Sequence, residues 1–180
     1  RAGVTPFARA RTNSPEAIGS QMTNGVMGIF VPHVDTPEQA ERAALAARYP
    51  PDGILSVPGA VPQFGYKKVP LPEATARFNQ EVMVVAMIES AEAVTNVEAI
   101  AATKGIDALF IGASDLTFDF GIPSDYGHER TTEAVARVCA AARTNTIIAG
   151  MGGVKEDADW ARYVKLGIRL ILTENDLSLL

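Results

Sequence analysis

The sequence predicts an α/β fold in which strands of a parallel sheet alternate with helices along the whole chain. Short apolar runs of strand length recur from one end to the other, and most lack the polar alternation of a half-exposed strand. Most of these runs are followed by the i, i+3, i+4 apolar spacing of an amphipathic helix. Strands buried on both faces and joined through helices are typical of a parallel sheet with right-handed crossovers.

Six βα steps can be counted, and the clearest strand is the run VMVVAMI at 82–88. We expect strands at 4–8, 27–31, 82–88, 108–111, 147–149 and 170–172. A closed (β/α)8 barrel needs eight steps and typically about 250 residues. Six steps are therefore compatible with a barrel of which two units precede this stretch, or with an open doubly wound sheet. No G-x-G-x-x-G motif follows a strand, which argues against dinucleotide binding.

Helix signals stand between these runs. Ser14-Pro15 is typical of a helix start, and Thr36-Pro37 begins a helix that ends before Pro50-Pro51. Further helices are predicted at 92–103, 131–143 and 155–166, the last with Trp160, Tyr163 and Val164 facing inward. Residues 54–72 carry many Gly and Pro without a period, so we expect a long functional loop there.

Composition limits the function classes. The chain of 180 residues has a net charge of −5 and no Lys/Arg-rich run, so neither nucleic acid nor an anionic membrane surface is an expected partner. No apolar run approaches the roughly 20 residues of a membrane-spanning helix. The single cysteine, Cys139, cannot form an intrachain disulfide, which favours a cytoplasmic location. We expect one partial domain over 1–180, and the first residue, Arg1, indicates a fragment.

Polar residues that could take part in catalysis or binding follow the predicted strands. Glu89 and Asp115 come from consecutive strands, so their carboxylates are expected to meet at one edge of the sheet. A divalent cation would relieve their repulsion and leave positions for water and a chelating 2-keto acid. Arg9 ends the first strand and could donate to an oxyanion. Backbone N–H groups around Ser114 and Asp115 could hold the carboxylate of the acid.

Simpler interpretations compete with this one. Glu89 or Ser90 could merely cap the next helix, and Arg9 could be a solvated arginine at a strand end. His33 could be a ligand or a base, although a loop histidine is commoner, and His128 lies in a polar stretch typical of the surface.

Three stretches together resemble one known family. They are GIFVPHVDTPEQAERAALAARYPPDGI (28–54), MIESAEAVTNVEAIAATKGIDALFIGASDLTFDFG (87–121) and ENDLSLL (174–180). With Arg9 in PFARARTNSP, they are similar to the metal-dependent pyruvate aldolases of the HpcH/HpaI aldolase and citrate lyase superfamily. The resemblance extends over nearly the whole chain.

The resemblance implies a (β/α)8 TIM barrel of the phosphoenolpyruvate/pyruvate type in a homo-oligomer, usually a hexamer, that uses Mg²⁺, Mn²⁺ or Co²⁺. The family's metal carboxylates fall on Glu89 and Asp115, its catalytic pyruvate-binding arginine on Arg9, and its carboxylate-binding backbone groups on Ser114 and Asp115. The implied reaction is reversible cleavage of a 4-hydroxy-2-oxo acid to pyruvate and an aldehyde through a metal-stabilised enolate. Oxaloacetate decarboxylation, citryl-thioester cleavage and a catalytically silent binding subunit remain as alternatives.

The chain departs from the family pattern at several positions. The two strands that carry the family's catalytic histidine are expected before Arg1. Met87 stands where many members have glutamine, Asn24 where relatives have an aspartate that supports the base, and Leu55 where many have arginine.

Overall fold

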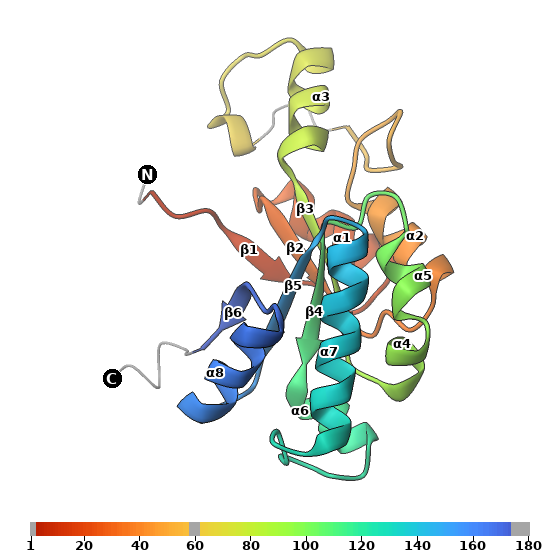
Figure 1. The fold of residues 1–180 in the computed structure, drawn as a ribbon. Coiled ribbons are helices and arrows are strands. Elements are labelled where there is room, and N and C mark those ends of the chain that lie inside the picture. Colours follow the sequence, from red (N-terminus) through yellow and green to blue (C-terminus); the bar gives the residue numbers. More distant parts are fainter. Residues whose placement is uncertain (1–2, 58–61, 174–180) are drawn as a thin grey trace.

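A six-stranded parallel sheet forms the centre of the computed structural model, which describes residues 3–57 and 62–173. The strands are β1 (Phe7–Arg9), β2 (Gly28–Val31), β3 (Met83–Ile88), β4 (Ala108–Gly112), β5 (Ile148–Gly152) and β6 (Leu170–Leu172). They pair in chain order, β1-β2-β3-β4-β5-β6 (Figure 1). A doubly wound sheet reverses its order at a switch point. The unbroken order therefore decides against that alternative and makes the sheet a section of barrel wall.

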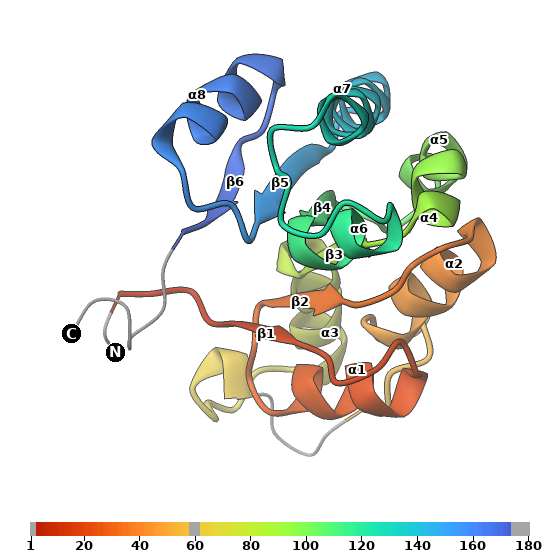
Figure 2. The same cartoon turned by 90° about the horizontal axis from the view of Figure 1, so that it is seen from below.

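Most of the helices lie on one side of this curved sheet. Seen from the end at which α6 lies, α1, α2, α5, α7 and α8 follow its outer face (Figure 2). The helices are α1 (Pro15–Thr23), α2 (Pro37–Ala46), α3 (Leu71–Glu81), α4 (Ala91–Thr95), α5 (Val97–Ala101), α6 (Ala113–Asp119), α7 (Glu129–Thr144) and α8 (Asp157–Leu166), with a 3-10 turn η1 (Pro62–Phe64). None of the helices in the described part of the chain is both long enough and apolar enough to cross a membrane.

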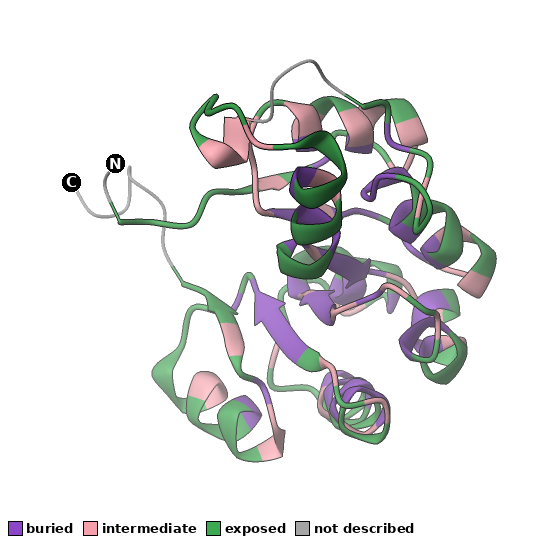
Figure 3. Ribbon diagram, turned by 90° about the horizontal axis from the view of Figure 1, so that it is seen from above, coloured by how far each residue is buried: buried purple, intermediate pink, exposed green. Residues whose placement is uncertain are grey.

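Both faces of the sheet are covered in its middle, which explains the uninterrupted apolar runs. Along β3, Val84 and Ala86 face the main core between sheet and helices. Val85 and Met87 face the other way, into a second cluster with Ala108 and Phe110. The buried strands stand out against the exposed outer faces of the helices (Figure 3). Successive residues of these strands therefore face opposite faces of the sheet, and both faces are covered by apolar side chains.

The structure corrects several predicted elements. The loop expected over 54–72 ends earlier, because α3 begins at Leu71 and continues to Glu81. This helix stands at the end of the sheet opposite α6 (Figure 1), and only Ala74, Phe78 and Asn79 are buried in it. Its N-cap, Pro70, makes no side-chain hydrogen bond. The helix was therefore missed because it has neither a capping residue nor a long apolar stripe.

Two further elements that follow strands differ from the elements predicted from the sequence. The helix expected at 92–103 is two helices, α4 and α5, which meet at Asn96. The Asn96 side chain donates a hydrogen bond of 2.8 Å to the carbonyl of Asp35. Directly after the strand predicted at 108–111, where no helix was predicted, the chain is helical from Ala113. In α8, Tyr163 is buried and Trp160 half-buried as expected, but Val164 is exposed.

Candidate active site

The polar residues singled out in the sequence meet at the carboxyl edge of the sheet. Arg9 is the last residue of β1, and Glu89 directly follows β3. Asp115 lies in the first turn of α6, which starts directly after β4. Because all the strands are parallel, these ends lie on the same side of the sheet, the side of α6 in Figure 2.

Glu89 is the centre of this edge. It is only 3% exposed, whereas the Arg9 side chain is half exposed. Arg9 Nη2 lies 3.9 Å from Glu89 Oε1, and His33 Nδ1 lies 3.4 Å from Oε2. The backbone N–H of His33 also donates to Oε2 at 2.9 Å. The buried carboxylate therefore has two basic side chains close to it, from the ends of β1 and β2.

The helix that follows Glu89 does not use it as a cap. Ser90 is the N-cap of α4, and its hydroxyl accepts the N–H of Ala93 at 3.0 Å. The same hydroxyl donates a short hydrogen bond to Asp35 Oδ1. The simpler interpretation of Glu89 as a capping residue is therefore wrong, and its carboxylate is left for the edge of the sheet.

Burial raises the pKa of Glu89 above its ordinary value. The hydrogen bond from the His33 N–H, the His33 ring and Arg9 act in the opposite direction, while the like charge of Asp115 raises the pKa further. Burial penalises the charged form because it removes water, and a nearby cation restores it. The environment of Glu89 is thus suited to an additional positive charge. Asp115 is close enough for its negative charge to raise the pKa of Glu89.

Glycine at two positions allows the strand ends to approach closely. A Cβ atom on Gly112 would lie 2.7 Å from Glu89 Oε1 and 2.8 Å from Glu89 Cγ. A Cβ atom on Gly153, whose φ is +94°, would lie 2.9 Å from Ser114 Oγ. Cβ atoms in proteins essentially never make contacts this short, so a larger residue at Gly112 would displace the carboxylate of Glu89.

Ser114 and Asp115 are exposed in the first turn of α6. Ser114 Oγ lies 3.4 Å from the hydroxyl of Tyr126, in the loop between α6 and α7. N–H groups in a first helical turn have no acceptor within the helix. Ser114 and Asp115 therefore carry backbone donors without an acceptor inside α6, in the turn that directly follows β4.

The donor set fits a hard divalent cation that takes two protein ligands. No group of three or more His, Cys, Asp or Glu side chains suited to a metal occurs within residues 3–57 and 62–173. Magnesium is commonly held by one or two carboxylates, with water and substrate oxygens in the other positions. Glu89 Oε1 accepts no hydrogen bond from the described residues, whereas Oε2 is occupied by His33. One carboxylate oxygen of Glu89 therefore remains as a ligand, and Asp115 is the second candidate.

The loop after β2 supports Glu89, and this support was not predicted from the sequence. The N–H of Val34 donates to the carbonyl of Met87 at 3.2 Å, and Asp35 is held by Ser90 and Asn96. His33 was considered as a ligand or a base, but its contact with Glu89 joins residues 56 positions apart. Such a contact has no local sequence signal.

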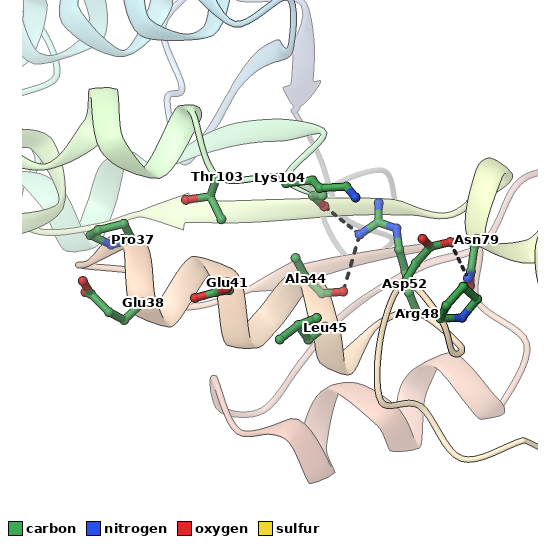
Figure 4. A pocket seen from close by; sticks show the side chains of 12 residues that line it. Pro37, Glu38, Glu41, Ala44, Leu45, Arg48, Asp52, Asn79, Thr103 and Lys104 are labelled. Atoms are coloured by element: carbon green, nitrogen blue, oxygen red, sulfur yellow. Dashed lines mark hydrogen bonds between the residues drawn. The ribbon is translucent and has the colours of Figure 1, made fainter.

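A separate cavity of about 620 Å³ lies along α2 in the helical layer (Figure 4). Arg48 in its wall is nearly buried and pairs with Asp107 at 2.9 Å, just before β4. The same guanidinium donates to the carbonyls of Gly105 and Ala44 at 2.7 and 3.5 Å. These bonds join the end of α2 to the start of β4, so Arg48 has a structural role away from Glu89.

Comparisons with known proteins show which family the chain resembles. The family model described as HpcH/HpaI aldolase/citrate lyase matches residues 1–168. The 5-keto-4-deoxy-D-glucarate aldolase of Escherichia fergusonii is 34% identical over 175 residues, which are 96% of this chain and 66% of the relative. The chain thus spans just under two thirds of that relative's length.

Two solved structures share the fold. An HpcH/HpaI aldolase from Desulfitobacterium hafniense matches with a TM-score of 0.90 and 27% identity, over 99% of this chain and 68% of its own. An HpcH/HpaI aldolase/citrate lyase family protein from Burkholderia cenocepacia matches with a TM-score of 0.87 and 31% identity, over 97% and 68%. Of the stretches that carry the resemblance in the sequence, 174–180 lies outside the described residues. The match of the family model over nearly the whole chain shows that this protein belongs to the HpcH/HpaI aldolase/citrate lyase family.

Proposed function

We propose that this chain supplies the metal-binding half of a carbon–carbon lyase that cleaves 4-hydroxy-2-oxo acids reversibly to pyruvate and an aldehyde. The observation that carries the proposal is the position of Glu89. It is a buried carboxylate at a strand end, with Arg9 and His33 on one side and Asp115 on the other. The aldolase names of the relatives supply the reaction class.

Glu89 and Asp115 would hold one Mg²⁺, Mn²⁺ or Co²⁺ ion, together with the keto and carboxylate oxygens of the acid. When bound, the ion supplies a Lewis acid that polarises the keto group and stabilises the negative charge of the enolate. The protein's own task is to hold the acid in one orientation. Backbone N–H groups of Ser114 and Asp115 would bind its carboxylate from the side of β4.

Arg9 is the proposed catalytic residue. Its guanidinium lies beside Glu89 Oε1 and is half exposed, so a substrate oxygen can reach it. Negative charge on the keto oxygen grows as the carbon–carbon bond breaks, and a fixed donor contributes most where charge develops. Arg9 would therefore bind the transition state more tightly than the substrate.

The complete protein is proposed to form a closed (β/α)8 barrel and a cytoplasmic homo-oligomer. In the described part of the chain, β1 and β6 each pair with one neighbour only. An exposed edge strand presents unpaired backbone groups, and a closed barrel has no edges. Two further strands between β6 and β1 would complete the eight of this fold.

The substrate proposed first is a hydroxylated oxo-dicarboxylate, because 5-keto-4-deoxy-D-glucarate appears in the name of the 34% identical relative. A second candidate, citryl-thioester cleavage, is supported by the citrate lyase half of the family description. Both reactions break a carbon–carbon bond beside a carbonyl group, and oxaloacetate decarboxylation uses the same polarisation. The same two-carboxylate edge could also serve a catalytically silent binding subunit.

The test is release of pyruvate by the full-length protein with added Mn²⁺, measured with lactate dehydrogenase and NADH. The proposal expects pyruvate from 5-keto-4-deoxy-D-glucarate and from shorter 4-hydroxy-2-oxo acids, and none after chelation with EDTA. Pyruvate from oxaloacetate alone would favour the decarboxylase, and cleavage of citryl thioester alone would favour the lyase. A bound 2-oxo acid without turnover of any of these substrates would favour the silent subunit.

A further inference from the structure

The last residue of α6 is bonded to the helix that follows Glu89. Asp119 Oδ2 accepts the backbone N–H of Ala91 at 2.8 Å. Ala91 is the first residue of α4, and only Ser90 separates it from Glu89. N–H groups in a first helical turn have no acceptor within their own helix. Asp119 therefore supplies an acceptor to the start of α4 from the next βα unit, 28 positions along the chain.

This bond is separate from the cap of α4. The hydroxyl of Ser90 accepts the N–H of Ala93 at 3.0 Å, so α4 has a cap of its own. In the part of the chain that the structure describes, no other hydrogen bond joins α6 to α4. The buried residues Leu116 and Thr117 hold α6 against the core. The carboxylate of Asp119 is then what connects α6 to the segment after β3.

The helical repeat relates Asp119 to Asp115. Residues four positions apart lie on the same face of an α-helix, about one turn from each other. Because Asp119 contacts the start of α4, this face of α6 is turned toward the end of β3, where Glu89 lies (Figure 2). The like charge of Asp115 raises the pKa of Glu89, which agrees with that direction. The bond of Asp119 therefore holds the helix face of Asp115 toward the strand end of Glu89.

We propose that Asp119 is a positioning residue that fixes the distance between the carboxylates of Glu89 and Asp115 and thereby sets the affinity for the divalent ion. The proposal rests on the metal-dependent function argued above. Asp119 is not assigned as a third ligand, because no group of three metal-binding side chains occurs among the described residues. Residues that support metal ligands typically change metal affinity by about ten- to a hundredfold.

The hydrogen bond can be removed from either side. Asp119→Ala removes the acceptor, and Ala91→Pro removes the donor, because proline has no N–H and is well tolerated at the first position of a helix. The backbone of Ser90 is extended, with φ −140° and ψ 163°, as a residue before proline requires. Asp119→Asn is the conservative variant, since its amide oxygen can still accept the N–H of Ala91.

The matched control is Glu98→Ala, which removes another exposed contact between two helices. Glu98 accepts two hydrogen bonds of 2.8 Å from Arg137 and so joins α5 to α7 in the helical layer. Neither residue follows a strand directly, so the loss of this contact should leave the carboxyl edge of the sheet unchanged.

The affinity of the full-length protein for Mn²⁺ is measured by electron paramagnetic resonance of the free ion, and circular dichroism checks that each variant is folded. We expect the dissociation constant to rise about tenfold in Asp119→Ala and in Ala91→Pro, and no further in the double variant. It should stay at the parental value in Asp119→Asn and in Glu98→Ala. If one of the two disrupting variants is unfolded, the other carries the test.

Parental affinity in the folded disrupting variants would overturn the positioning role of Asp119. Losses that add in the double variant, or a tenfold loss in Asp119→Asn, would also overturn it, because the hydrogen bond to Ala91 would then not be the cause. Parental Mn²⁺ affinity in Glu89→Gln would instead refute the metal site, and with it the proposed function.

Discussion

The chemistry of the edge depends on how a few side chains surround one carboxylate. Glu89 is withdrawn from water, and Arg9 and His33 approach its two oxygens from neighbouring strand ends. A buried carboxylate in water-poor surroundings needs compensating charge to remain ionised. Arg9 supplies part of that charge in the described structure, and it can turn toward a substrate because half of its side chain is exposed.

Arg9→Lys should lower kcat for aldol cleavage by on the order of a hundredfold, the scale of removing one donor that stabilises developing charge. KM should change much less, because the donor acts mainly in the transition state. Lysine keeps the charge but loses the planar fork of hydrogen bonds. Arg11→Lys, at an exposed arginine two residues away, is the control and should retain parental kinetics.

The rate of pyruvate proton exchange separates two roles for Arg9. That half-reaction needs no aldehyde, so it should fall in parallel with cleavage if Arg9 stabilises the enolate. Exchange at the parental rate, together with slow cleavage, would make Arg9 an acceptor-side or structural residue.

Gly112→Ala should lower kcat/KM on the order of a hundredfold, because the new Cβ would lie 2.7 Å from Glu89 Oε1 and force the carboxylate to move. Gly127→Ala is the matched control, since its Cβ would meet neighbours only at 3.7 Å or more. Metal affinity measured by titration calorimetry should fall with activity in the first variant and stay constant in the second. Parental Mn²⁺ affinity in Gly112→Ala would show that Glu89 is not a ligand.

At the scale of elements, the connection from α2 to β3 depends on one buried amide. Asn79 in α3 accepts the N–H of Tyr49 and donates to its carbonyl, both at 2.8 Å, and also donates to Asp52 at 3.0 Å. This side chain therefore supplies the acceptor for the N–H of Tyr49 and adds a third donor to the Tyr49 carbonyl, which also accepts the N–H groups of Asp52 and Gly53. It fastens α3 to the end of α2.

Asn79→Ala should lower the free energy of unfolding by about 1–3 kcal/mol, because the buried N–H of Tyr49 loses its acceptor. Gln80→Ala, at the exposed neighbouring position, should change it by less than about 0.5 kcal/mol. Urea unfolding followed by circular dichroism measures both. Equal effects of the two substitutions would contradict the anchoring role of Asn79.

The elements that the sequence predicted well are those buried on both faces or clearly capped. The run 82–88 covers β3 because Val84 and Val85 face opposite layers and both are apolar. By contrast, α3 was missed because much of its surface is exposed and its start has no side-chain cap. Local patterns report burial and capping, so elements that lack both are not visible in them.

The residues of the site that follow strands could be predicted from the sequence, but their long-range contacts could not. Glu89, Asp115 and Arg9 could be placed at one edge because each follows a strand and parallel strands end together. The contribution of His33 could not, because it depends on a hydrogen bond to a residue 56 positions away. The order of the six strands could not be predicted either, since a barrel wall and a doubly wound sheet share the same alternating pattern along the sequence.

At the scale of the whole molecule, the sheet ends in two edges. In the part of the chain that the structure describes, β1 pairs only with β2 and β6 only with β5. Large apolar side chains lie at these edges, including Phe7, which is 40% exposed, and Leu172, which is 60% exposed. Edge strands of this kind pair readily with other chains.

The 180-residue chain by itself should therefore associate as its concentration rises, measured by size-exclusion chromatography with light scattering. In the complete protein, the backbone amides of β1 and β6 should be protected from hydrogen exchange to the same degree as those of β3 and β4. A 180-residue chain that stays monomeric at high concentration would contradict the need for closure. So would rapid exchange at both edges of the complete protein.

The most direct test of the central claim is exchange of the methyl protons of pyruvate with heavy water, followed by proton NMR with Mg²⁺ and the full-length protein. The account predicts exchange that is lost on addition of EDTA, restored by excess Mg²⁺, and absent in Glu89→Gln and Asp115→Asn, while circular dichroism shows both variants folded. Exchange at the parental rate in either variant, or in the presence of EDTA, would show that Glu89 and Asp115 do not hold the ion that activates pyruvate.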